Sequence, residues 1–446
     1  MALVVTILLF IFSIVYFTAP TVGDVYYSSI FVVYWGVTFF YLLKYKRRSL
    51  FCFELFFSVS FFLCLFMTRY LLPLMDAYES MSFIEDSSLI FRAYTLSMIG
   101  YLSYILGLVL TKKKKVVDNK VLSYGFEPMS RQVNVLANLL CTSFIILMFV
   151  NGGTSMFSMY SNPDVLTSDR LSGFAMYLNF AIITYIVSVV TTFASLPNRK
   201  GTFHLSIIHS FALLFIVNSI ILIGTFLLSG YRSNAIQIII PIVLAYQIKY
   251  KPLKPLTVIG VFAVGALLMF FIGMTRSGDA FDTTGYSTLT YLRDFKSANS
   301  ATIFLVNYAD MHGVTYGTNM IFPILSIIPG LQSVVGLFVD SQMIAPVSSA
   351  TFTMAFSSNS GFGTNIIGDI YYTFGFLGVI VLMFIYGCFL RRFSNAKNNY
   401  EIVMFLVFSG NAMFAPRVEY CYIIRSIAWS VIFLFLVRLF QRSYNL

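Results

Sequence analysis

Long apolar stretches alternate with short polar segments along almost the whole chain. A helix needs about 20 predominantly apolar residues to cross the hydrocarbon core of a bilayer, so each long stretch predicts a transmembrane helix. The predicted spans are residues 2–19, 26–43, 50–68, 89–110, 133–150, 172–195, 205–228, 234–248, 256–273, 366–390, 402–415 and 423–440. The pattern therefore predicts an all-α polytopic integral membrane protein with about 12 transmembrane helices.

Basic residues gather in every second polar segment, after each even-numbered span. The clusters lie within residues 44–48, 112–115, 199–200, 249–254, 391–397 and 438–442. Cytoplasmic loops of membrane proteins carry an excess of lysine and arginine, and a single topology satisfies all of these clusters. This topology places both termini in the cytoplasm and the segments after odd-numbered spans on the outer side.

The composition excludes an ordinary soluble domain, because mean hydropathy is +0.83 and only 11% of the residues are charged. The net charge of +11 would suit a nucleic-acid-binding protein. The basic residues lie in short loops beside the spans, however, so membrane anchoring explains them and no nucleic acid is expected. The first stretch lacks a basic n-region, so we interpret it as a retained span and not a signal peptide. No CxxC or Cys/His spacing indicates zinc.

The longest segment on the outer side covers residues 274–365. A loop of this length is rarely structureless, and residues 291–308 place apolar side chains near helical spacing. Residues 321–338 are apolar but interrupted by proline and glycine, which favours a re-entrant or interfacial helix. We expect this loop to form a helical cap. The chain then divides into residues 1–273 with nine spans, the cap 274–365, and residues 366–446 with three spans.

Nine basic residues fall on the outer side of the predicted topology, and all but one are arginines. They are Arg69, Arg92, Arg170, Arg232, Arg276, Arg293, Lys296, Arg417 and Arg425. Guanidinium groups bind carboxylates and phosphates through paired hydrogen bonds, and arginine beside hydrocarbon is unfavourable unless it pairs or lines a wet cavity. The pattern indicates an outward-facing site for an anionic substrate.

Three candidate anion-binding arginines lie in the middle of the chain. Arg232 follows Gly230 in the outer turn between two spans, although it could instead cap carbonyl groups or contact lipid headgroups. Arg276 follows the ninth span, and Arg293 begins the predicted cap helix. For Arg293, a structural ion pair with a nearby acid is the alternative.

Two more candidate arginines, Arg417 and Arg425, flank Glu419 at the last outer turn. The three side chains would converge on a cavity mouth, unless Glu419 and Arg425 form an internal salt bridge. Asp369 lies inside the tenth span near its outer end. A carboxylate buried there needs a partner or a place in a cavity wall.

The candidate acids and bases are few. His312 is the only histidine on the outer side, and histidine can accept a proton from a hydroxyl near neutral pH. Asp310, Asp294 and Glu419 are rival catalytic bases. The outer acids form no recognisable set of metal ligands, so no metal is expected. The chain has no P-loop, GxSxG, HExxH or dinucleotide fingerprint.

Several of these segments together resemble the Wzy-type polymerases of O-antigen, capsule and enterobacterial common antigen repeat units. The resemblance covers mainly residues 160–430. It rests on Ser-Gly-Tyr-Arg-Ser at 229–233, Tyr-Leu-Arg-Asp at 291–294 with Asn-Tyr at 307–308, the glycine- and aromatic-rich segment 361–375, and Arg-Val-Glu at 417–419 with Arg425 after it. The chain departs from the family at Val418, which separates an arginine and a glutamate that are adjacent in some relatives. That insertion puts the role of Glu419 in doubt.

The resemblance implies a membrane glycosyltransferase of the bacterial inner membrane, with a periplasmic cap and active site. A chain carried on undecaprenyl diphosphate would be transferred to an incoming lipid-linked repeat unit, without a cofactor or soluble nucleotide sugar. Arg232, Arg276 and Arg417 would bind the diphosphates, with Arg293 and Arg425 in support. Expected partners are the lipid-linked oligosaccharide, membrane lipids and a protein that regulates chain length.

Two other functions share much of this chemistry. A flippase would bind the same lipid-linked oligosaccharide, but the long cap and the lack of an evident internal repeat disfavour it. A ligase would transfer finished polysaccharide to a different acceptor, and the residues leave this alternative open.

Overall fold

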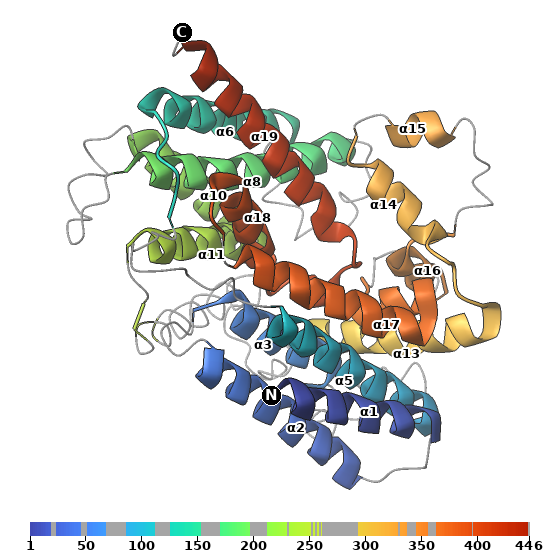
Figure 1. The fold of residues 1–446 in the computed structure, drawn as a ribbon. Helices are drawn as coiled ribbons and strands as arrows, with labels where there is room; N and C mark the ends of the chain where they lie inside the picture. The colour runs from blue at the N-terminus through green and yellow to red at the C-terminus, as the bar shows by residue number, and fades with distance from the viewer. Residues whose placement is uncertain are drawn as a thin grey trace, which may run out of the picture.

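The computed structural model describes most of the chain and shows an assembly of helices (Figure 1). The described residues are 1–18, 24–45, 51–67, 86–111, 125–152, 170–196, 212–229, 232–250, 253–254, 257, 260, 293–328, 331–336, 345–355, 363–394 and 396–444. Within these ranges every regular element is a helix, as the alternation of apolar and polar segments predicted.

Helices occupy eleven of the twelve predicted spans. They are α1 (Ala2–Thr18), α2 (Asp24–Tyr45), α3 (Phe53–Leu65), α5 (Ser87–Leu110), α6 (Arg131–Gly152), α8 (Arg170–Ser195), α10 (Ala212–Leu228), α11 (Arg232–Lys249), α17 (Ile366–Phe393), α18 (Asn399–Gly410) and α19 (Tyr422–Tyr444). Among the described residues, six of these helices, α2, α5, α6, α8, α17 and α19, are long and apolar enough to cross a membrane, and the other five are apolar but shorter. The ninth predicted span, 256–273, lies outside the described residues except for residues 257 and 260.

In the described part of the predicted cap, five short or medium helices are present. They are α13 (Arg293–His312), η5 (Thr318–Met320), α14 (Ile321–Leu325), α15 (Leu331–Gly336) and α16 (Ser348–Ala355). Helix α13 confirms the helical spacing at 291–308. The apolar stretch 321–338 is split between α14 and α15, which agrees with a broken segment and not a straight crossing.

Helix ends that the charge pattern assigned to one side lie together. At the predicted cytoplasmic ends, the Arg391 guanidinium lies 5.8 Å from the Tyr45 ring centroid, and Arg438 Nη2 lies 2.5 Å from Glu127 Oε2. In Figure 1 both chain termini lie to the left of α14, α15 and α16. These contacts join helix ends that the charge pattern places on one side, and the full topology stays a prediction from the positive-inside bias.

Among the described residues, helices α5 and α17 form one of the two most extensive helix contacts, together with α6 and α8. A Cβ atom on Gly107 would overlap the Phe384 carbonyl oxygen, and one on Gly387 would overlap the Tyr104 carbonyl oxygen. Small residues allow this backbone-to-backbone contact, which is a common basis of helix association in membranes.

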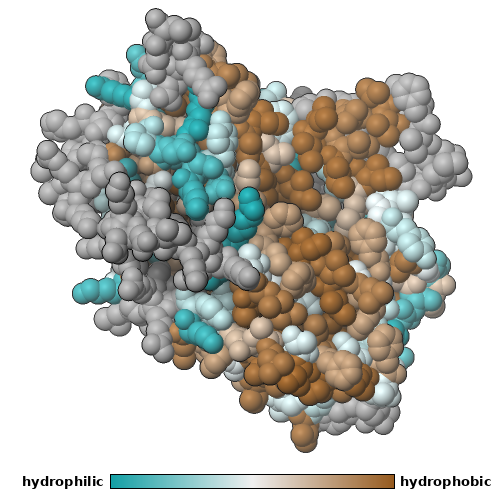
Figure 2. Space-filling view, viewed as in Figure 1, coloured by the Kyte–Doolittle hydropathy of each residue, from teal (hydrophilic) through white to brown (hydrophobic). Residues whose placement is uncertain are grey.

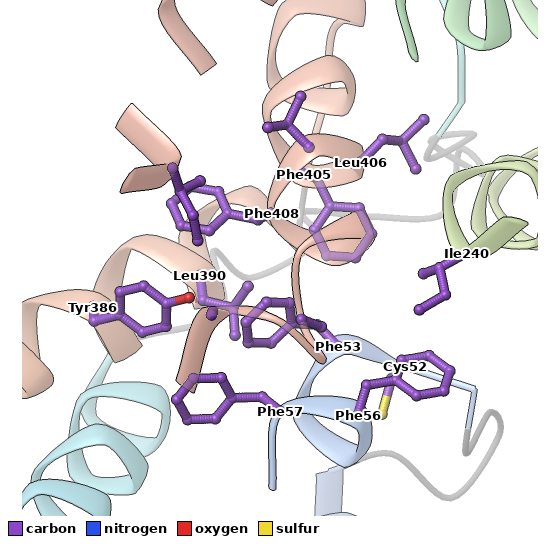
Figure 3. Close-up of a cluster of buried hydrophobic side chains, with 14 of the residues drawn as sticks. Cys52, Phe53, Phe56, Phe57, Ile240, Tyr386, Leu390, Phe405, Leu406 and Phe408 are labelled. Atoms are coloured by element: carbon purple, nitrogen blue, oxygen red, sulfur yellow. The ribbon is translucent and has the colours of Figure 1, made fainter. Parts of the chain in front are cut away.

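Aromatic side chains connect α3 with the C-terminal helices (Figure 3). The ring of Tyr386 on α17 lies 5.5 Å from Phe57 of α3 and 5.8 Å from Phe408 of α18, between ring centroids. Phe53 lies in the same cluster, and all four side chains are buried. This packing fixes α3, α17 and α18 relative to one another, and with them the segment that follows α18.

A buried polar network joins α6, α8 and α10. Asn138 accepts a 2.6 Å hydrogen bond from Ser188, Asn134 accepts one of 2.7 Å from Thr192, and Asn218 donates to the Asn138 carbonyl oxygen at 3.1 Å. Hydrogen bonds between helices satisfy side chains that would otherwise be unpaired in hydrocarbon.

Large apolar side chains cover much of the surface. Leu3, Phe10 and Phe17 on α1 are exposed, and so is Leu228 at the end of α10. Figure 2 shows a broad apolar surface flanked on the left, and more sparsely on the right, by hydrophilic residues. An exposed apolar surface of this extent marks contact with lipid, so the protein is a multi-pass membrane protein.

Candidate functional site

The structure describes the side chains of five of the nine predicted site residues. Arg276 lies outside the described residues. Arg232 begins α11, Arg293 begins α13 and Asp294 follows it, but the side chains of these three also lie outside the described part of the chain. The five described side chains are Arg417, Arg425, His312, Asp310 and Glu419.

Arg417 ends a short 3-10 helix, η7 (Ala415–Arg417), in the connection between α18 and α19. Pro416 suits the start of such a turn because proline has no N–H to satisfy there. The Ala415 N–H donates to the Asn411 carbonyl oxygen at 2.7 Å, and Ser60 of α3 donates to the Met413 carbonyl oxygen at 2.5 Å. These bonds hold the connection against α3.

Asp369, at the start of α17, forms a hydrogen bond with this connection. Its side chain is 1% exposed, and Asn365 caps the helix by accepting a 2.8 Å hydrogen bond from the Gly368 N–H. Asp369 Oδ1 accepts a 2.6 Å bond from Ser348 of α16, and Oδ2 accepts a 2.9 Å bond from the Tyr420 N–H. The buried carboxylate of Asp369 was predicted to need a partner. Its partners are a hydroxyl and a backbone amide, and not one of the arginines.

Glu419 makes a parallel contact with α16. Its Oε1 accepts a 2.5 Å hydrogen bond from Ser349, the neighbour of Ser348. The alternative salt bridge between Glu419 and Arg425 does not form in the described part of the chain. Two adjacent serines of the cap thus bind two carboxylates from different segments.

Arg425 lies half-buried in the first turn of α19 and forms no ion pair among the described residues. A helix N-terminus carries partial positive charge, so a cation in the first turn is unfavourable unless an anion compensates it. The first turn of α19 contains no acidic residue. The position of Arg425 therefore suits a site that binds an anionic group.

Asp310 has a different environment. Its Oδ2 forms a 2.6 Å ion pair with Arg92 of α5, and its Oδ1 accepts a 2.7 Å hydrogen bond from Tyr371 of α17. Arg92 also donates to the Tyr16 hydroxyl of α1 at 3.0 Å. The sequence suggested only that Arg92 lies at the outer boundary, whereas the structure shows that it connects α1 and α5 to α13.

His312 forms no hydrogen bond or ion pair with Asp310 in the described part of the chain. Its Nδ1 lies 3.0 Å from the Tyr308 carbonyl oxygen, and the His312 and Tyr308 rings stack with centroids 4.2 Å apart. A carbonyl oxygen only accepts hydrogen bonds, so Nδ1 carries the proton. In a neutral imidazole this leaves the Nε2 lone pair available, and the side chain is exposed.

A chain of contacts connects His312 with the α18–α19 connection. The Tyr308 and Tyr372 ring centroids lie 6.0 Å apart, and Thr351 of α16 donates to the Tyr372 hydroxyl at 3.3 Å. Tyr372 lies one helical turn after Asp369. The histidine, the carboxylates and the late arginines therefore occupy the same end of the helix assembly.

Helix α17 is broken in this region at Gly375, where φ is 67° and ψ is −160°. Residues with a Cβ rarely adopt this conformation. The Thr315 N–H donates to the Tyr372 carbonyl oxygen at 3.0 Å, and Asn319 donates to Thr373 at 2.9 Å. The segment after α13 thus donates hydrogen bonds to polar groups of α17 beside the break. Irregular backbone within a membrane protein requires such partners.

The family model for O-antigen polysaccharide polymerase Wzy matches residues 1–445. The chain belongs to the Wzy O-antigen polymerase family. The match extends the resemblance from the segment 160–430 to nearly the whole chain. No curated protein and no solved structure matches this chain.

In the connection between α18 and α19 of this Wzy-family protein, burial changes the pKa of two side chains, Tyr420 and Cys421. Burial raises the pKa of the Tyr420 phenol, and burial together with the nearby carboxylates of Asp369 and Glu419 raises the pKa of Cys421 to about 12. The Cys421 thiol therefore stays protonated at neutral pH. Within the described residues, no group of three or more His, Cys, Asp or Glu side chains is arranged to hold a metal ion.

The sequence did not predict the two serines of the candidate site and indicated only a minor role for Asp369. Ser348 and Ser349 carry no motif, since hydroxyl residues are common in loops. The usable signal was Asp369 itself, because an acid within an apolar span must have a nearby donor.

Proposed function

We propose that this Wzy-family protein polymerises oligosaccharide repeat units carried on undecaprenyl diphosphate, at the periplasmic face of the bacterial inner membrane. Family membership supports an O-antigen polymerase activity. The assignment of the site rests on one observation: Arg417, Arg425 and the cap helices lie at the same end of the helix assembly. The domain division at residues 274 and 365 and a chain-length regulator as partner are part of this proposal.

The reaction moves the growing chain from one lipid carrier to the next repeat unit. A hydroxyl oxygen of the lipid-linked acceptor attacks the anomeric carbon of the donor's first sugar. The bond from that carbon to the diphosphate oxygen breaks, and undecaprenyl diphosphate leaves with the electron pair. The hydroxyl proton passes to a base on the protein. The site must therefore stabilise a leaving anion and accept one proton.

Arg417 and Arg425 are proposed to bind the diphosphate and stabilise the leaving group. Arg417 lies at the end of η7, and Arg425 lies where the helix N-terminus already favours an anion. Arg232, Arg276 and Arg293 are proposed to complete the cluster. Guanidinium groups suit this role because they remain charged and bind two phosphate oxygens at once.

His312 is proposed as the base, because its Nε2 carries the lone pair in the tautomer that the Tyr308 carbonyl selects. Glu419 is the second candidate, and its bond from Ser349 orients one oxygen and leaves the other to face a substrate. Asp310 is proposed to hold α13 through Arg92. Asp294 remains a candidate supported by the sequence alone.

Purified protein supplied with lipid-linked repeat units tests these roles. Arg417→Ala and His312→Ala should each lower the rate of ladder formation about 10²-fold or more. Arg438→Ala is the matched control, since Arg438 pairs with Glu127 at the opposite end and should retain the ladder. A wild-type ladder in Arg417→Ala would remove this connection from the mechanism. Transfer only to a different acceptor would indicate a ligase, and translocation without new bonds a flippase.

No cofactor or metal is proposed. Polymerisation should persist after chelator treatment, whereas a loss restored by one particular divalent ion would contradict this expectation.

A further inference from the structure

We propose that Asp369 is a positioning residue that holds the Arg417–Arg425 connection in place. This inference deepens the proposed function, because it concerns how that connection reaches its working position. Asp369 is the one described side chain that hydrogen-bonds both to α16 of the cap and to the backbone of the connection, from a third element, α17.

The two bonds are accepted by different oxygens of the carboxylate. Ser348 precedes Asp369 by 21 residues and Tyr420 follows it by 51, so neither contact is a consequence of local sequence. The Tyr420 N–H lies between the two proposed diphosphate ligands along the chain. Loss of this bond would therefore release the segment that carries both arginines.

Burial makes the arrangement unfavourable unless both oxygens are satisfied. Asp369 is 1% exposed, and its partners are neutral donors. A buried carboxylate without a cation is retained at a substantial free-energy penalty, and the first turn of a helix offsets only part of it. A purely apolar contact would fill the space at lower penalty but would not bind a backbone N–H. This requirement explains a polar side chain at this position.

The shape and the charge of the side chain can be separated. In Asp369→Asn, the amide oxygen can still accept from the Tyr420 N–H, and the amide nitrogen can donate to Ser348. The Ser348 hydroxyl has an acceptor for its own proton in Thr364, 3.1 Å away. Asp369→Asn thus preserves the connection, whereas Asp369→Ala removes both bonds. A residue that acted through its charge or its proton would fail in both variants.

Cys421 is a natural reporter of the position of the connection. It follows Tyr420, is 6% exposed, and its thiol contacts Met320 Sδ at 3.5 Å. A protein in which Cys52, Cys64, Cys141 and Cys388 are replaced by alanine keeps Cys421 as its single thiol. The rate of maleimide labelling of the purified protein then measures how often the connection opens, independently of catalysis.

Asp369→Ala should raise the Cys421 labelling rate about ten- to a hundredfold, as expected for loss of two buried hydrogen bonds from a local opening equilibrium. It should also abolish the ladder and raise the KM for the lipid-linked donor where residual activity remains. Asp369→Asn should keep both readouts within about threefold of the parent, less than the tenfold that corresponds to 1.4 kcal/mol. Glu127→Gln, which alters a carboxylate at the opposite end, is the matched control for general loosening.

The outcomes separate the two proposals. A protected Cys421 in Asp369→Ala, or Asp369→Asn matching Asp369→Ala in both readouts, overturns the positioning role. Rapid labelling with an undiminished ladder supports positioning and instead contradicts the role of the connection in polymerisation. If Asp369→Ala does not accumulate, Ser348→Ala removes only one bond and should give intermediate labelling, and labelling at the parental rate would count against the inference.

Discussion

Two regions at the same end of the molecule contain arginines and carboxylates, but they use them differently. In the Arg92 region, Asp310 binds the guanidinium directly, and Tyr371 donates a hydrogen bond to the other carboxylate oxygen of Asp310. In the Arg417–Arg425 connection, Glu419 binds a serine, and Arg425 has no ion pair among the described residues.

The contrast shows how the same residue types serve structure or binding. An ion pair that satisfies both partners joins helices but has little remaining capacity for a charged ligand. A carboxylate satisfied by a neutral hydroxyl leaves a nearby guanidinium available. The first region is therefore suited to holding α13 against the bundle, and the second is suited to the anion-binding role proposed for it.

The strongest test of the contrast is Arg425→Ala. We expect the rate of polymerisation to fall about 10²- to 10³-fold, the range seen when one stabilising donor is removed from a transition state. The melting temperature should stay near that of the parent, because no native ion pair is lost. Polymerisation assays and thermal unfolding in the same detergent give both values. A large fall in melting temperature with unchanged rate per folded molecule would place Arg425 in a structural role.

The second test concerns α17, which reaches both regions. Gly375→Ala should lower the free energy of unfolding by about 1–3 kcal/mol, because the positive-φ conformation disfavours a Cβ. Both regions should loosen, since Tyr371 and Asp369 lie on the segment before the break. Gly36→Ala is the control: Gly36 lies in α2 with open space around it, and its substitution should be neutral or stabilising. Equal melting temperatures for the two variants would show that the break is not under strain.

The smallest expected effect belongs to the paired region. Arg92→Ala should destabilise the protein by about 1 kcal/mol, because the ion pair is partly exposed and solvent screens it. Polymerisation should fall only in proportion to the folded fraction. A double-mutant cycle with Asp310→Asn, read by thermal unfolding, should show coupling between the two positions. A rate loss in Arg92→Ala without destabilisation would move this region into the catalytic machinery.

The sequence predicted the helices well, because a membrane imposes a length and an apolarity on each span. Helices α5 and α17 agree with their predicted spans within a few residues. The break between α18 and α19 was also predicted, since Arg417 and Arg425 interrupt apolar sequence. These features depend on local composition and need no knowledge of tertiary contacts.

The contacts between distant segments were not predictable in the same way. Arg92 and Asp310 are 218 residues apart, and nothing in either neighbourhood specifies the other. The pairing of Ser348 with Asp369 depends on how α16 packs on α17. The break at Gly375 was hidden because glycine is also common in unbroken transmembrane helices. Arg232, Arg276 and Arg293 keep the roles that the sequence suggested as predictions.

The glycine contact between α5 and α17 bears on how a lipid carrier reaches the site. Where Gly107 and Gly387 meet, the two backbones touch and leave no room between them for an isoprenoid tail. At this level the seam between the two helices is therefore closed to sideways passage from the bilayer. Under the proposed function, a carrier lipid would pass this level along another face of the bundle and not between α5 and α17.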